Sequence, residues 1–425
     1  MNFVVEMASK CSGRTGTLAG VQKLAHVEIQ TPGFVYHTKG GSIPHLSKEV
    51  ENYLNVEPKF LQYSLTNTEH MEEAVAASGA GIANFTAQKQ SVALLVLQDP
   101  AELCLPNFHE KDLVPIYSRS GRKNYTSEKY FKLVETFKPN IYVPLFDGDT
   151  TNESSKKRVQ KSFDRTETFV EQCLELHRKS DTLTQSTLLG PIIGGFNTNI
   201  REKSVKFLKK FDADFGGYLI AGLHSNGGSA TELDKESLLD IVSQVCKELP
   251  NQKPRFLFGA YTPKMVLELV VRGIDVFDTS YPYLKTKQNR ALTFSFSVDE
   301  PSVENMETEL DVKDTRWADD FTGFSSSCSC LACTKHTRAY SHHLYNTREM
   351  LGPILLMIHN LHHYNKFFQA IRKHVSNDTI STLIEHLEKQ KDVPQVVEEQ
   401  HKISMQDINA ESPLIAETAQ KRVKV

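Results

Sequence analysis

The chain of 425 residues lacks the features that mark secreted and membrane-spanning proteins. No stretch approaches the ~18 consecutive apolar residues that a transmembrane helix needs. The first residues, MNFVVEMASKCSGRTG, contain no basic start followed by an apolar stretch of signal-peptide length. We therefore expect a soluble, intracellular protein with no integral membrane segment.

The chain also lacks a large excess of either positive or negative charge. The chain has 49 Lys and Arg against 52 Asp and Glu, a formal net charge of −3. This balance excludes a global positive field that holds nucleic acid non-specifically, so any contact with RNA must be a local patch. With 39% hydrophobic residues, the chain is long enough to form one large domain or two ordinary ones with substantial cores. A peptide and a largely disordered chain are excluded.

Seven cysteines are too few for a disulfide framework in a chain of this length. Three of them, Cys328, Cys330 and Cys333, lie so close together that their thiolates can approach a single tetrahedral Zn²⁺. A fourth ligand on a separate helix is favoured, because it would tie the cysteine turn to the rest of its subdomain. The candidate histidines are His336, His342, His343, His359, His362 and His363.

His359 lies in an apolar-rich helical segment, PILLMIHNLHHYNKFF, and would offer its imidazole from the inner face. We expect one structural Zn²⁺, because four protein ligands leave no open position for a catalytic water, and no fourth cysteine lies nearby for an iron–sulfur cluster. The alternative is a loop that carries three reduced thiols.

Short β-branched runs alternate with segments of helical spacing from about residue 20 to 300. This pattern predicts repeated βα units around a parallel sheet. Seven or more units favour an α/β fold of the (β/α)₈ barrel type over an open doubly wound sheet, because no glycine-rich dinucleotide fingerprint follows the first strand. The predicted strands are Gly33–His37, Ser91–Leu97, Asn140–Phe146, Leu189–Ile193, Tyr218–Leu223, Arg255–Gly259 and Ile274–Phe277.

Capping residues predict where several helices begin. Helices are expected to start at Thr126, at Asp234, and at Thr262 with Pro263 in the first helical position. The predicted organisation is a barrel over 1–300, a zinc-binding subdomain with closing helices at 337–350 and 353–372 over 301–375, and a polar flexible C-terminal tail over 376–425.

Five segments, in this order, resemble those of the tRNA-guanine transglycosylase (queuine tRNA-ribosyltransferase) family, and the resemblance extends over about residues 20 to 375. They are TPGFVYHTKGG from Thr31, YVPLFDGDT from Tyr142, FGGYLIAGLHSNGG from Phe215, GIDVFDTSYP from Gly273, and the three cysteines followed 26 residues later by His359. The resemblance implies an irregular (β/α)₈ barrel with a zinc insertion. It also implies exchange of guanine for queuine at the wobble position of tRNAs with GUN anticodons.

In this family an Asp carboxylate attacks the ribose C1′, and a second Asp acts as general acid and base. By resemblance, Asp278 matches the nucleophile position, Asp147 a carboxylate that binds the base, and Gly222 and Leu223 the loop that contacts it. The other reading of Asp278 is a carboxylate that hydrogen-bonds the backbone at the rim of the barrel.

The chain departs from the family at two places that matter for catalysis. The Asp-Ser-Gly-Gly-Phe-Gln motif of the second Asp is absent, and Asp99 in LLVLQDPAEL lacks its glycines. Ile193 stands where a Gln should bond the base, which would leave a polar edge of the base unpaired at about 1–3 kcal/mol per group. Loss of the proton-transfer carboxyl would lower the rate by roughly 10²–10⁴.

These losses, beside a complete zinc motif, resemble the accessory, non-catalytic branch of the family. The resemblance implies a heterodimer with a catalytic paralogue, a dimer interface that includes the zinc subdomains, and a role in holding tRNA. It implies a cytoplasmic location, including the cytosolic face of the mitochondrial outer membrane. Two alternatives stay open: a self-sufficient homodimer in which Asp278 attacks and Asp99 or Asp147 is the acid, and a zinc-stabilised barrel that only binds proteins.

Overall fold

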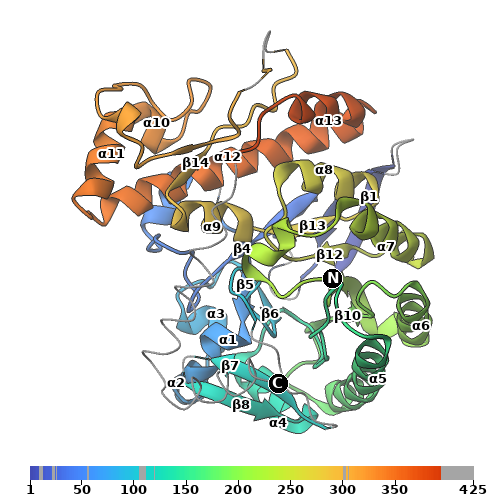
Figure 1. Ribbon diagram of the computed structural model, residues 1–425. Helices are drawn as coiled ribbons and strands as arrows, with labels where there is room; N and C mark the ends of the chain where they lie inside the picture. The colour runs from blue at the N-terminus through green and yellow to red at the C-terminus, as the bar shows by residue number, and fades with distance from the viewer. Residues whose placement is uncertain are drawn as a thin grey trace, which may run out of the picture.

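The computed structural model describes residues 1–8, 13–21, 24, 26–54, 57–104, 112–118, 120–299, 303–304 and 306–393. Eight parallel strands close into a barrel, and pairing of β13 with β4 completes the ring (Figure 1). The predicted α/β barrel is therefore confirmed. Its strands are β4 (Gly33–His37), β5 (Phe60–Ser64), β6 (Val92–Val96), β9 (Ile141–Tyr142), β10 (Thr187–Ile192), β11 (Phe215–Ile220), β12 (Arg255–Leu257) and β13 (Val276–Asp278).

Successive side chains of the barrel strands face two different cores. In β6, Val92 and Leu94 pack with the side chains of one cluster, whereas Ala93 and Leu95 pack in the larger cluster beneath the helices. Alternate residues of a strand point to opposite faces, and both faces of this sheet are covered. This explains why β6 reads as an unbroken apolar run. β5 is not among the predicted strands, because its sequence FLQYS mixes polar with apolar residues.

A three-stranded antiparallel sheet packs at the N-terminal end of the barrel. It consists of β1 (Asn2–Ala8), β2 (Arg14–Ala19) and β3 (Ile29–Thr31), in that order. Leu18 of β2 is buried in the same core cluster as the barrel strands. Neither this sheet nor the antiparallel pair β7 (Val114–Ser118) and β8 (Gly121–Tyr125) is among the predicted elements.

The predicted helix starts are confirmed by their caps. The side chains of Thr126, Asp234 and Thr262 accept hydrogen bonds from the backbone amides three residues on, and Pro263 lies in the first turn. The helices before residue 290 are α1 (Leu65–Thr68), α2 (Glu72–Ser78), α3 (Ile82–Phe85), α4 (Ser127–Phe137), α5 (Lys156–Lys179), α6 (Thr198–Lys209), α7 (Lys235–Glu248), α8 (Pro263–Val271) and α9 (Ser280–Lys287), with 3₁₀ turns η1 (Val50–Leu54), η2 (Glu69–Met71), η3 (Asp212–Asp214) and η4 (Gly227–Thr231).

The C-terminal part of the chain packs along one side of the barrel, and the long helix α12 crosses it (Figure 1). The strand β14 lies before residue 300 and pairs with β15 after it, so this sheet spans the predicted boundary. The elements are β14 (Arg290–Leu292), β15 (Glu309–Asp311), η5 (Thr315–Trp317), α10 (Leu331–Lys335), α11 (Arg338–Asn346), α12 (Leu351–Ser376) and α13 (Ile380–Glu388).

The predicted tail from residue 376 is wrong in its first part, because α13 lies there. Ile380, Leu383 and Leu387 are buried at helical spacing, and α13 packs against α8 and α12. Residues 394–425 of the predicted tail lie outside the described residues. In the described part of the chain, no helix is both long and apolar enough to cross a membrane.

Candidate functional site

The predicted metal ligands come together between two helices. Cys330 caps the start of α10, Cys333 lies within it, Cys328 precedes it, and His359 lies in α12; their four ligand atoms are all within 4.8 Å of one another. The distances from His359 Nδ1 are 3.6 Å to Cys328 Sγ, 3.6 Å to Cys330 Sγ and 3.3 Å to Cys333 Sγ. Tetrahedral Zn²⁺ with ordinary bond lengths separates N and S by about 3.5–3.6 Å. The four residues therefore fit a single metal ion.

Hydrogen bonds outside the cluster fix the orientation of its ligands. His359 Nε2 lies 2.8 Å from the carbonyl oxygen of Leu292 in β14, which places the ring proton on Nε2 and leaves the lone pair of Nδ1 toward the thiols. The next residue, Asn360, accepts from the Leu292 amide and donates to the Arg290 carbonyl. The backbone amide of Cys333 donates to Cys330 Sγ at 3.4 Å. The imidazole is thus held in position by the same strand that pairs with β15.

The other candidate histidines make different contacts. His363 Nε2 lies 2.9 Å from the Phe294 carbonyl, and His342 Nδ1 lies 3.0 Å from the Val312 carbonyl. His336 stacks on an aromatic ring. Of the six candidates, His359 is the one that belongs to the cluster found among the described residues.

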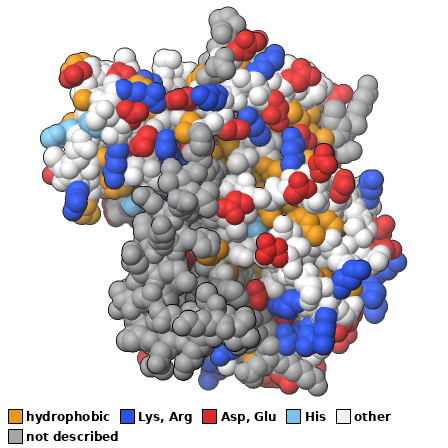
Figure 2. Space-filling view, viewed as in Figure 1, with side chains coloured by type: hydrophobic (Ala, Val, Ile, Leu, Met, Phe, Trp, Pro, Cys, Tyr) orange, Lys and Arg blue, Asp and Glu red, His pale blue; other side chains and the backbone are white. Residues whose placement is uncertain are grey.

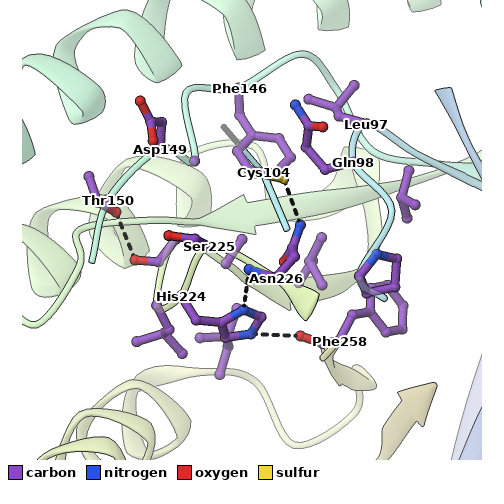
Figure 3. Close-up of a pocket in the computed structure, with 18 of the residues that line it drawn as sticks. Leu97, Gln98, Cys104, Phe146, Asp149, Thr150, His224, Ser225, Asn226 and Phe258 are labelled. Carbon is purple, nitrogen blue, oxygen red and sulfur yellow. Dashed lines mark hydrogen bonds between the residues drawn. The ribbon is translucent and has the colours of Figure 1, made fainter. Parts of the chain in front are cut away.

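A second site lies at the carboxyl ends of the barrel strands, where a cavity of 110 Å³ is lined by the predicted Gly222 and Leu223 (Figure 3). Gly222 has φ +69°, and a Cβ there would lie 2.7 Å from Thr150 Oγ1. Thr150 donates to the Gly222 carbonyl at 2.7 Å. The cavity is smaller than the roughly 300–1,000 Å³ that is usual for small-molecule sites.

Several polar groups in this cavity bond to one another. Asn226 Nδ2 contacts Cys104 Sγ at 3.1 Å, and its backbone amide donates to His224 Nδ1 at 3.0 Å (Figure 3). Burial lowers the pKa of His224 to about 4, so its ring is neutral at pH 7. Gln62 of β5 is different, because neither polar atom of its buried amide has a partner within the described residues. Neither His224 nor Gln62 is among the predicted site residues.

Asp278, the residue predicted to match the nucleophile position, is buried at the end of β13 and does not line the cavity. Its Oδ2 accepts from the Gly259 amide at 2.6 Å, and its Oδ1 accepts from the Ser280 amide at 2.6 Å. Burial raises the pKa of Asp278 to about 6, although these hydrogen bonds favour the ionised form. The side chain therefore joins the end of β12 to the start of α9.

Asp147 also bonds within the chain. It is fully buried, and its carboxylate contacts Arg158 at 2.5 Å and 3.0 Å and Arg165 at 3.1 Å. Both arginines lie on α5, seven residues apart and so on one face of the helix. Its neighbours Phe146 and Gly148 line the cavity, whereas Asp147 does not. The spacing of the two arginines is the signal that sequence reasoning missed.

Asp99 follows β6 and forms a buried pair with His37, the last residue of β4. His37 Nε2 lies 2.8 Å from Asp99 Oδ1, which also accepts from the Ala101 amide at 2.8 Å. Burial alone would raise the pKa of Asp99, but attraction and hydrogen bonding by His37 outweigh burial and lower it. Parallel strands end at one edge, so a His ending one strand and an Asp after another could have suggested this pair. Ile193 is buried and does not line the cavity.

The chain is similar to known proteins of one family over most of its length. A family model described as queuine tRNA-ribosyltransferase matches residues 9–392. The protein named queuine tRNA-ribosyltransferase accessory subunit 2 of Aedes aegypti is 64% identical over 394 residues, which cover 93% of this chain and 94% of that protein. Proteins of the same name from Culex quinquefasciatus and Drosophila melanogaster are 60% identical over 430 residues (100% of both chains) and 45% identical over 402 residues (93% and 94%). The chain therefore belongs to the queuine tRNA-ribosyltransferase family.

Proposed function

We propose that this chain is the accessory, non-catalytic subunit of a heterodimeric queuine tRNA-ribosyltransferase. A catalytic paralogue performs the exchange of guanine for queuine, and this chain supports assembly and positions the tRNA. The names of its relatives support this role. The observation that carries the proposal is a contrast: the metal ligands are complete and converge, whereas the carboxylates near the barrel mouth are bonded within the chain.

Base exchange needs one carboxylate free to attack C1′ and one proton-carrying carboxyl beside it. For Asp278 to attack, it would have to give up two backbone hydrogen bonds, and each orphaned amide costs about 1–3 kcal/mol. The lowered pKa of Asp99 leaves that residue ionised, so it carries no proton at neutral pH. Asp147 is neutralised by two arginines. None of the three is disposed for the chemistry.

The ion that we propose for the cluster is one structural Zn²⁺ per subunit. Three thiolates and one imidazole in tetrahedral arrangement are a ligand set that favours zinc, and four protein ligands leave no position for a reactive water. The ion would fasten α10 to α12 and so fix the loops between them. Elemental analysis of the purified chain, with about one zinc per chain expected, tests this assignment.

The partner surface that we propose lies around α11, beside the metal cluster. Phe321 is 77% exposed and Met350 is 80% exposed, and Tyr340 and Leu351 are also exposed. Phe321 precedes Thr322, whose carbonyl accepts from the backbone of Arg338 at the start of α11. These four side chains lie before α11, on it, and at the start of α12, and exposed apolar side chains gathered in one region mark interaction sites. The catalytic subunit is the proposed occupant, as the family resemblance implies.

Contacts with tRNA must be local, because the net charge of the chain is slightly negative. Acidic and basic side chains are interspersed over the face in Figure 2, and basic ones gather over α5 and α6. Lys156, Lys157 and Lys161 at the start of α5 are exposed, and α5 has no acidic residue in its first turn. These side chains are suited to phosphate contacts that position tRNA without reading its sequence.

Co-purification with the catalytic paralogue tests the proposal as a whole. We expect a one-to-one complex by mass, no incorporation of labelled guanine into tRNA by this chain alone, and incorporation by the complex. Exchange by the chain alone, abolished by Asp278→Asn, would instead establish the homodimeric enzyme. If the complex is active but crosslinking of this chain recovers no tRNA, then only the protein-binding role would remain.

We further propose a cytoplasmic location, including the cytosolic face of the mitochondrial outer membrane, as the resemblance implies. Fractionation of cells that express the tagged chain tests it. Recovery in the mitochondrial matrix would contradict the proposal.

A further inference from the structure

A groove of 890 Å³ lies at the end of the barrel opposite the mouth, between β1 and the carboxyl ends of α7 and α8. Figure 1 shows β1 beside these two helices. Four of the residues that line the groove are cations, and none is a carboxylate. The cations are Arg14, Lys247, Arg255 and Arg272.

The positive charge of the groove is only partly compensated. Asp275, fully buried, bonds Arg14 Nη2 at 2.6 Å and the backbone amide of Arg255 at 2.7 Å. Arg272 pairs with Glu268 at 2.7 Å. Lys247 is exposed and forms no ion pair within the described part of the chain. Two carboxylates thus face four cations, so the groove complements a ligand that carries negative charge.

The opposite wall of the groove is apolar and carries a free strand edge. Phe3, Val4 and Val5 of β1 line it, and Val4 is 59% exposed. Within the described residues β1 pairs on one side only, with β2. A free strand edge beside apolar side chains is suited to an added extended segment. A segment that combines β-branched residues with carboxylates would satisfy both walls.

The chain supplies such a segment within reach. Asp392 contacts Lys264 in the first turn of α8 at 2.8 Å, and α8 ends at Val271, which lines the groove. Nine helical residues span about 14 Å, which about four extended residues cover. The residues after 393 are Pro394-Gln395-Val396-Val397-Glu398-Glu399. An extended segment of this length would bring its two valines and two glutamates to the start of the groove.

We propose that residues 394–400 bind in this groove as an added strand beside β1. Alternate side chains of a strand share a face, so Val397 and Glu399 would point into the groove, with Val397 toward Val4 and Glu399 toward Lys247 and Arg272. The tether favours this occupant over any free peptide, because linkage through α13 gives it an effective concentration of about millimolar. The bound segment would cover the free edge of β1 and so protect it from pairing with other chains.

Crosslinking in the full-length chain tests the proposal. Val4→Cys with Glu398→Cys is compared with Glu236→Cys with Glu398→Cys, treated with a short bismaleimide at low protein concentration and mapped by peptide mass. Glu236 is an exposed residue on α7, next to Lys235, which contacts Glu388. It is therefore close to the start of the segment, and an unbound segment would reach it at least as readily. We expect the Val4 pair to crosslink about tenfold faster.

Charge reversal supplies the second arm. Lys247→Glu should slow the crosslink of the Val4 pair, and Glu399→Lys added to Lys247→Glu should restore part of the rate, because the opposite charges then face each other again. Equal rates for the two cysteine pairs would overturn the proposal. A Val4 rate that is insensitive to Lys247→Glu would overturn the charge assignment, and would leave the groove for an external acidic peptide or an anionic lipid.

Discussion

Replacement of one metal ligand should remove the link between α10 and α12. It should lower both the thermal stability of the chain and its binding to the catalytic paralogue. Cys330→Ser leaves three ligands around a site where His359 is fully buried. Without the ion, the buried imidazole and thiols lack their common partner, at about 1–3 kcal/mol for each unsatisfied group. Two such groups amount to roughly 2–6 kcal/mol. A chain of 425 residues has an unfolding entropy of roughly 0.9 kcal/mol/K, so this loss corresponds to a fall in melting temperature of about 2–7 °C.

The assay combines zinc analysis, thermal unfolding and co-purification with the catalytic paralogue. Cys173→Ser is the matched control, because Cys173 is equally buried but lies in α5, away from the cluster. The Cys173→Ser variant measures the loss of stability caused by a buried hydroxyl alone. It should still bind zinc and the catalytic paralogue. A chelator should lower the melting temperature of the native chain but not that of Cys330→Ser. Full zinc content in Cys330→Ser, or a chelator that leaves the native chain unaffected, would refute the reasoning.

Three further predictions concern the barrel mouth and the partner surface. Burial raises the pKa of Asp278 to about 6, from an unfolded value near 4. Between these two pH values the folded chain binds a proton at Asp278 that the unfolded chain has lost. The free energy of unfolding should therefore fall by about 2–3 kcal/mol as pH rises from about 4 to 6. Asp278→Asn should remove that slope in urea titrations while exchange by the heterodimer stays intact; an unchanged slope would contradict it. His37→Ala should lower the unfolding free energy by about 1–3 kcal/mol, because it removes the imidazole partner of a buried carboxylate, and an unchanged unfolding free energy would argue against this contact as a source of stability. The double variant Phe321→Ser with Met350→Ser should weaken partner binding by roughly 10–100-fold in calorimetry without lowering the melting temperature. The control Tyr53→Ser, at a 51% exposed position on η1, should leave partner binding unchanged.

The sequence predicts the barrel well because its signals are local. Alternation of β-branched runs with helical spacing identifies seven of the eight strands, and single capping residues such as Thr126 and Asp234 fix helix starts. The strand β5 is not predicted because its sequence FLQYS lacks a clear hydrophobic pattern. It is buried on both faces only because the barrel closes around it. α13 is not predicted although Ile380, Leu383 and Leu387 recur at helical spacing, because the segment is short and its apolar face is buried only against α8 and α12.

The metal centre and the barrel mouth differ in how far sequence reasoning reaches. Three cysteines on one turn define most of a tetrahedral site by themselves, and the choice of His359 needs only one long-range contact. The fate of the carboxylates depends on partners distant in sequence. Asp147 is bound by arginines 11 and 18 residues away, and His37 lies 62 residues from Asp99. No local motif specifies such pairs, so the residue types alone left Asp147 as a base-binding candidate.

Retention of Asp278 does not by itself indicate retained chemistry. Its carboxylate bonds the Gly259 and Ser280 amides, and so joins two segments at the rim of the barrel. Its removal would orphan two buried amides, whether or not a substrate ever binds. A residue with this structural role is needed for stability whether or not the chain has the acid and the base-binding Gln that the family resemblance leads one to expect. The structural role of Asp278 must therefore be tested by pH-dependent stability, and its predicted chemical role by exchange in the isolated chain.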